Sequence, residues 1–265
     1  MKKILISFMI LMTVALSYSC KEEPTDSSFR EFELKDASGT IRKGGVYLPQ
    51  NMKKGKQYPV IYMEDGLVFK DCRFKQLIDS LTEIGSIGPV IVACSYENKS
   101  TIPGFKLSYR NAEFVESIAK TDPTLAILFT NHINYFKDEF IPYIEKNYPV
   151  LKSKQDRIFF GTSNSADFGI TFSMRYPSEI AEYWCYSPVN SSIDEYGMLS
   201  ENVSYRICWG TKEEVAMFDY FPALVKDIRK RGGKVQSWAF VGGHDRGMWR
   251  YTFGQELMRR FPDKD

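Results

Sequence analysis

Residues 159–166, Phe-Phe-Gly-Thr-Ser-Asn-Ser-Ala, decide how this chain folds. An apolar run from Ile158 to Phe160 stops abruptly at small residues, and a helix-like pattern follows at once. This order predicts a buried strand, a sharp turn at Ser163 and then a helix. Small residues on such a turn allow the strand and the helix to pack closely. The stretch therefore predicts an α/β fold with Ser163 at the end of a strand.

Ser163 is the candidate nucleophile. The segment Gly161–Ser165 resembles Gly-x-Ser-x-Gly, the turn on which α/β-hydrolases expose a nucleophilic serine, with Ser165 in place of the last glycine. Many α/β proteins also need small residues on such a turn for backbone reasons alone. The turn by itself leaves both interpretations open.

The composition fits one large domain. The chain has 265 residues, of which 43% are hydrophobic and 26% charged, enough for a substantial buried core. The net charge is +2 with both signs interspersed, so neither a nucleic-acid partner nor a strongly charged substrate is expected.

The N-terminus differs in kind from the rest. Two lysines precede an apolar run from Ile4 to Leu16, which is too short for a membrane span and predicts a signal peptide over residues 1–19. Cys20 resembles the lipid-modified cysteine of a bacterial lipobox, with ordinary secretory cleavage as the alternative. Residues 20–28 are polar and predict a tether, which favours an exported, lipid-anchored protein. The acidic start of this tether resembles the export signal of some surface-exposed lipoproteins, so the outer-membrane surface is one expected location. The domain itself is expected at 29–265.

Four cysteines lie in the predicted domain, and they are spaced too widely for a zinc motif. Three of them lie within apolar runs and are expected in the core, whereas a disulfide is left open. The four are Cys72, Cys94, Cys185 and Cys208.

The remaining patterns predict a mostly parallel sheet with helices on both faces. Alternating segments at 29–35 and 41–48 predict an antiparallel hairpin at one sheet edge. Continuous apolar runs at 58–63 and 89–94, with helical periodicity between them, predict a β-α-β unit. Further along we expect a loop at 98–105, short helical pieces at 112–126, helices at 131–148, 166–176, 214–231 and 248–261, and strands at 181–186, 205–209 and 235–241.

A serine nucleophile needs a base, and the chain has only two histidines. His244 follows the last predicted strand through two glycines, at the sheet edge where Ser163 is also expected. His132 begins a predicted helix with no strand before it, so a capping or surface role is expected there.

An acid is expected to orient the base. Glu213 and Glu214 follow the strand at 205–209, and the order serine, acid, histidine is that of α/β-hydrolases. Glu213 is preferred because it is nearer the strand end, although both residues also fit a solvated helix start. Asp194 and Asp245 are weaker candidates.

Two backbone N–H groups are expected to form an oxyanion hole. One belongs to Asn164, which follows the nucleophile, and the other to Leu67, in the loop after the strand at 58–63. Gly66 would allow the backbone to approach a substrate carbonyl, although an ordinary strand-ending turn explains it equally well.

Several segments in order together resemble the putative-esterase family, which includes esterase D-like, enterochelin esterase-like and feruloyl esterase enzymes. They are Val46–Pro49, Tyr58–Gly66, Arg110–Phe114, Phe140–Tyr148, Gly161–Ser163 and Gly242–Asp245 with Trp249-Arg250. The resemblance implies an α/β-hydrolase fold with Ser163 as nucleophile, His244 as base and Glu213 as acid, and Leu67 and Asn164 as oxyanion donors.

The resemblance also has departures. Ser165 and Ala166 stand where relatives usually carry two glycines, and Leu67 stands where many carry glutamine. Arg110 and Glu113 match a recurring pattern with a structural or pocket-lining role.

These observations predict a serine carboxylic ester hydrolase that needs no metal or cofactor. Its substrate would be a small-molecule or oligosaccharide ester, such as a feruloyl or acetyl ester from plant polysaccharide. The alternatives are a siderophore esterase and a surface lipoprotein that binds ligands without catalysis. Four aromatic residues either stack on a sugar or phenol or belong to the core: Trp184, Tyr186, Trp209 and Trp249.

Overall fold

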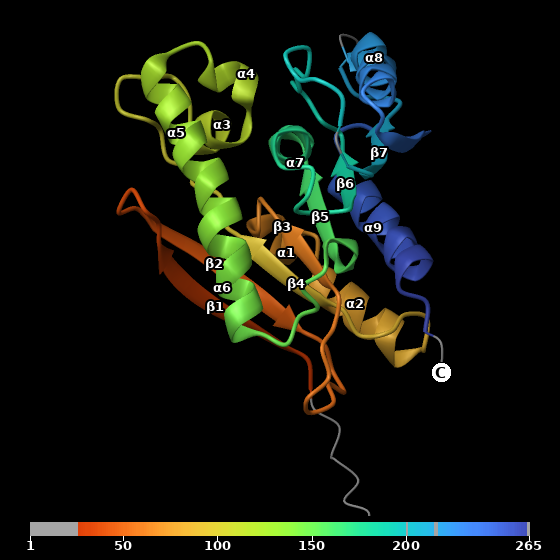
Figure 1. Cartoon of the computed structure of the whole chain (residues 1–265). Helices are drawn as coiled ribbons and strands as arrows, with labels where there is room; N and C mark the ends of the chain where they lie inside the picture. The colour runs from red at the N-terminus through yellow and green to blue at the C-terminus, as the bar shows by residue number, and fades with distance from the viewer. Residues whose placement is uncertain (1–25, 200, 215–216, 264–265) are drawn as a thin grey trace, which may run out of the picture.

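The computed structural model describes residues 26–199, 201–214 and 217–263. The predicted signal peptide and Cys20 lie outside the described residues. Eight strands form one mixed sheet in the order β1-β2-β4-β3-β5-β6-β7-β8 (Figure 1). The strands are β1 (Ser28–Lys35), β2 (Ile41–Leu48), β3 (Val60–Met63), β4 (Ile91–Ser95), β5 (Arg157–Thr162), β6 (Glu182–Tyr186), β7 (Ser204–Gly210) and β8 (Lys234–Phe240). The predicted α/β-hydrolase sheet, with its N-terminal antiparallel hairpin, is confirmed.

The hairpin lies at one edge of the sheet. β1 and β2 pair antiparallel from Ser28 opposite Leu48 to Lys35 opposite Ile41, and β2 then pairs antiparallel with β4. Asp36 closes the turn by accepting hydrogen bonds from the Thr40 N–H and the Ser38 hydroxyl. Ser28, predicted to belong to the tether, is already part of β1.

The strands from β3 to β8 run parallel, so their carboxyl ends meet at one edge of the sheet. Successive residues of β3 point into two separate cores, because Tyr62 packs on one face and Ile61 on the other. Burial on both faces explains why these strands read as continuous apolar runs.

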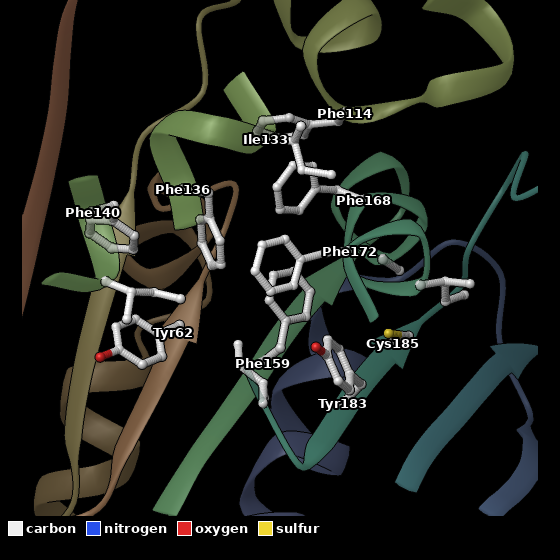
Figure 2. Packing of buried hydrophobic residues seen from close by; sticks show 14 of the residues in the cluster. Tyr62, Phe114, Ile133, Phe136, Phe140, Phe159, Phe168, Phe172, Tyr183 and Cys185 are labelled. Atoms are coloured by element: carbon white, nitrogen blue, oxygen red, sulfur yellow. The ribbon is translucent and has the colours of Figure 1, made fainter. Parts of the chain in front are cut away.

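Helices cover both faces of the sheet (Figure 1). On one face lie α1 (Leu67–Asp71), α2 (Phe74–Glu83) and α9 (Arg246–Arg260). On the other lie α3 (Tyr109–Phe114), α4 (Glu116–Ala119), α5 (Pro123–Asn134), α6 (Ile141–Asn147), α7 (Asn164–Arg175) and α8 (Met217–Lys230). Figure 2 shows the core on this second face, where Phe168 of α7 and Phe136, just after α5, meet Phe159 of β5.

The long helix begins earlier than the sequence pattern predicted. α5 starts at Pro123, with Asp122 as its N-cap, and continues through a π-helical turn over Tyr135–Phe140 into α6. Pro142 lies just after this π-helical turn, and the helix continues past it to Asn147.

The prediction of a surface or capping role for His132 is wrong. This residue lies in the last turn of α5, is 1% exposed and packs against the rings of Phe114 and Phe168. Its Nε2 lies 3.2 Å from Oε1 of Glu64, which is also buried. The error arose because α5 starts eight residues earlier than the predicted helix at 131, so that His132 lies in its last turn and not at its start.

All four cysteines of the domain are buried and free, including the three that were expected in the core. In the described part of the chain, no helix is long and apolar enough to cross a membrane.

Candidate active site

Ser163 sits on a strained turn between β5 and α7. Its φ of 58° and ψ of −130° are unusual for a residue with a side chain, and such strain is found mainly at functional sites. The Ser163 N–H donates to the Tyr186 carbonyl of neighbouring β6, which fixes the turn to the sheet. Gly161 is required, because a Cβ there would lie 2.5 Å from the Ser165 carbonyl oxygen.

The two departures from the family pattern are accommodated without backbone strain, since neither Ser165 nor Ala166 has a positive φ. The buried Ser165 hydroxyl accepts a hydrogen bond from the Thr162 N–H and donates one to the Thr162 carbonyl, both at 2.8 Å. Ala166 packs into the core. The Ser165 hydroxyl therefore stabilises the turn through the Thr162 backbone. Within the turn, only Ser163 has an unusual φ.

The structure brings His244 and Glu213 together. Nδ1 of His244 lies 3.1 Å from Oε2 of Glu213, although the two residues are 31 positions apart. His244 follows β8 and is 41% exposed at its side chain, whereas the Glu213 side chain is 3% exposed. A buried carboxylate beside one ring nitrogen leaves the other nitrogen of the ring free to face the cavity.

The second oxygen of Glu213 is held by two donors. Oε1 accepts hydrogen bonds from the Ser187 hydroxyl at 2.6 Å and from the Gly210 N–H at 2.8 Å. Burial by itself raises the pKa of Glu213, but the hydrogen bonds from His244, Ser187 and Gly210 outweigh burial and hold this pKa below its ordinary value. Glu213 is therefore ionised at neutral pH.

The other acids do not reach His244. Glu214 is exposed, and Asp245 caps α9 by accepting from the Met248 N–H at 2.8 Å. Asp194 is exposed, and its carbonyl accepts a hydrogen bond from Arg231. Of the predicted acids, Glu213 alone is paired with the histidine in the described structure.

A cavity of about 450 Å³ lies at the carboxyl edge of the sheet. Ser163 and His244 both line it, without a direct hydrogen bond between their side chains in the described structure. Such contacts are often long in unliganded enzymes and shorten when substrate binds. The other lining residues are Asp65, Val68, Glu97, Lys99, Ser108, Arg110, Thr162, Arg246 and Trp249.

The two predicted oxyanion donors differ in their surroundings. The Asn164 N–H begins α7 and makes no hydrogen bond within the described chain. The Leu67 N–H, at the start of α1, donates to Oε2 of Glu97 at 3.3 Å. Gly66 is needed for packing, because a Cβ there would lie 2.9 Å from the Ser95 carbonyl oxygen.

Buried Asp65 and half-buried Arg110 form an ion pair that supports this loop. The guanidinium of Arg110 donates to both carboxylate oxygens of Asp65, and the Nε contact is 2.6 Å. Asp65 has a φ of 59°, so the pair fixes an unusual backbone conformation just before Leu67. Glu113 instead pairs with the buried Arg42 at 2.5 Å, away from the cavity lining.

The four aromatic candidates differ in where their side chains lie. Trp249 lines the cavity, packs edge-on against His244 with ring centroids 4.7 Å apart, and donates its Nε1–H to the Ser187 hydroxyl. Trp184 and Tyr186 are fully buried core residues, and Trp209 stacks on Phe221.

Sequence reasoning missed Glu97 and Ser187, the first near the Leu67 N–H and the second beside Glu213. A signal was present for both, because each follows the end of a parallel strand, β4 and β6 respectively. Within residues 26–199, 201–214 and 217–263, no group of three or more His, Cys, Asp or Glu could hold a metal ion.

A mostly parallel eight-stranded sheet, a strained serine after β5 and a histidine–carboxylate pair at the same edge define an α/β-hydrolase. Residues 36–225 match the family described as "Putative esterase". The chain belongs to this family, so its class of activity is ester hydrolysis.

Solved structures share the fold. A ferulic acid esterase has a TM-score of 0.67 and 20% identity, over 89% of this chain and 99% of its own. The BES protein from Bacillus cereus has a TM-score of 0.67 and 16% identity, over 98% and 99%. The enterobactin esterase FES from Shigella flexneri has a TM-score of 0.67 and 13% identity, over 88% of this chain and 59% of that protein.

Proposed function

We propose that this protein is a serine carboxylic ester hydrolase with Ser163 as nucleophile, His244 as general base and Glu213 as the acid that orients it. The observation that carries the proposal is the 3.1 Å pairing of His244 with buried Glu213, beside a cavity that Ser163 also lines. A serine nucleophile needs a base and an acid that orients this base, and the positions of these three residues at one sheet edge support the proposal.

The proposed reaction has two steps. As Ser163 Oγ attacks the ester carbonyl carbon, Nε2 of His244 takes its proton, and Glu213 stabilises the resulting imidazolium. The N–H groups of Asn164 and Leu67 bind the oxyanion until it collapses and expels the alcohol, which takes the proton from His244. Water then attacks the acyl-serine in the same way, releasing the carboxylic acid and restoring Ser163.

For the substrate, we favour a small phenolic or acetylated ester of the kind found on plant polysaccharides. A cavity of about 450 Å³ has room for one aromatic acyl group, and Trp249 supplies an aromatic surface beside His244. The likeness to a ferulic acid esterase supports this choice, while the likeness to an enterobactin esterase supports a siderophore ester as the second candidate.

Replacing the nucleophile tests the proposal directly. Ser163→Ala should abolish hydrolysis of 4-nitrophenyl acetate and labelling by a fluorophosphonate probe, while thermal unfolding stays close to that of the wild type. Ser191→Ala, which changes a serine outside the cavity lining, is the matched control and should label normally. Full turnover by Ser163→Ala would refute the assignment, and an unlabelled wild type would favour the non-catalytic binding protein.

We also propose that the mature protein is exported and anchored to a bacterial membrane through lipid on Cys20. The apolar run before Cys20 and the polar residues after it support this, and Glu22-Glu23 favour the outer surface. Metabolic labelling with an alkyne fatty acid should mark the full chain and not Cys20→Ala. Equal labelling of both would contradict the anchor.

A further inference from the structure

Glu97 is a buried acid in the cavity that the proposed reaction does not use. It lies two residues beyond the end of β4, and its side chain is 0% exposed. Oε2 accepts the Leu67 N–H at 3.3 Å, and Oε1 lies 2.8 Å from the Lys99 ammonium in an ion pair outside hydrogen-bonding geometry. The residue lines the same cavity as Ser163.

We propose that Glu97 acts as a plug: its carboxylate occupies the Leu67 N–H of the oxyanion hole and so limits the rate of ester hydrolysis. This proposal rests on the function proposed above. The Leu67 N–H cannot serve a substrate carbonyl fully while it donates to a carboxylate. The negative charge of Glu97 would also repel the oxyanion that forms at the same N–H. The carboxylate must therefore move away before Leu67 can act as a full donor.

Three features make this displacement possible. The Leu67–Glu97 bond is long for a charge-assisted hydrogen bond, so it is weak. Lys99 is 57% exposed at its side chain and can accompany the carboxylate as it moves, so that the charge stays neutralised. The Leu67 backbone need not move with it, because Asp65, two residues before, is held by Arg110 and the Gly66 N–H by the Ser95 carbonyl.

The first experiment compares two variants with the wild type on 4-nitrophenyl acetate. Glu97→Gln keeps the shape and removes the charge, whereas Glu97→Ala also removes the acceptor. Loss of one oxyanion-hole donor costs about 10²–10³ in kcat, so release of a partly occupied donor should raise kcat about tenfold. Glu83→Gln, an exposed change at the end of α2, is the charge-matched control and should leave kcat unchanged.

The outcomes separate this inference from the proposed function. Higher kcat in both Glu97 variants, with little change in KM, supports the plug. If the wild type is active and the well-folded Glu97 variants are no faster, the role proposed for Glu97 is refuted, whereas the proposed esterase function stands.

A second measurement does not depend on turnover. Phenylboronic acid adds to an active-site serine and places an oxygen in the oxyanion hole, so its Kd reports on the hole in the ground state. Binding about tenfold tighter by Glu97→Gln than by the wild type supports the plug. Equal or weaker binding by the variant overturns it, whether or not either protein hydrolyses esters.

Discussion

Replacing Glu213 by glutamine should remove the orienting role of this acid in catalysis while leaving the fold intact. The direction of its hydrogen bonds is fixed by Trp249, whose indole N–H can only donate and does so to the Ser187 hydroxyl. Ser187 therefore donates its own proton to Oε1 of Glu213, as does the Gly210 N–H. In Glu213→Gln the amide oxygen must stay at this position, so the NH₂ group faces His244.

The consequence falls on the histidine. Facing an amide donor, Nδ1 of His244 becomes an acceptor, and the ring proton moves to Nε2, which then cannot take a proton from Ser163. The corresponding change in serine proteases lowers kcat by about 10⁴. At about 1.4 kcal/mol for each tenfold change, this corresponds to roughly 5.5 kcal/mol of transition-state stabilisation. Since both bonds to Oε1 are kept, unfolding free energy should change by less than about 1 kcal/mol.

The assay is kcat on 4-nitrophenyl acetate, with urea unfolding measured on the same samples. Glu214→Gln is the matched control, because Glu214 is the exposed neighbour of Glu213 and should retain kcat within about twofold. The reasoning is refuted if folded Glu213→Gln keeps kcat within tenfold of the wild type, or if Glu214→Gln loses as much.

Two further predictions concern stability. Ser165→Ala should destabilise the fold by about 1–3 kcal/mol in urea unfolding, because it leaves the buried Thr162 N–H without the hydroxyl it donates to; an unchanged midpoint would contradict the role given to Ser165. Burial lowers the pKa of His132 to about 4, below its value of about 6.5 in an unfolded chain. As pH falls from 6.5 to 4 the unfolded state takes up this proton first, so His132 should cost the wild type up to about 3 kcal/mol of stability. The loss should be missing in His132→Gln, and equal pH slopes for the two proteins would refute it.

Ser165 and Ala166 show what the sequence could predict about the turn and what needed the structure. From the sequence, Ser165 and Ala166 are only departures from the two glycines that relatives usually carry. In the structure both residues have helical backbones, and the unusual φ is at Ser163. Whether a side chain at 165 is tolerated depends on the space it meets, and here its hydroxyl bonds to the Thr162 backbone.

The sequence by itself determined the order of strands and helices and the residues at the strand ends. Apolar runs, turn residues and helical periodicity are local properties, and a parallel sheet brings every strand's carboxyl end to one edge. Ser163, Glu213 and His244 could therefore be assigned to one edge from the order of elements alone.

Only the tertiary structure decided which groups meet there. It selected Glu213 over the adjacent Glu214, placed Glu97 on the Leu67 N–H and buried His132 against Glu64. These pairs join residues 31, 30 and 68 positions apart. A hydrogen bond depends on ångström-scale distance and direction, and for such distant residues these are set by how the helices and loops pack on the sheet rather than by local sequence.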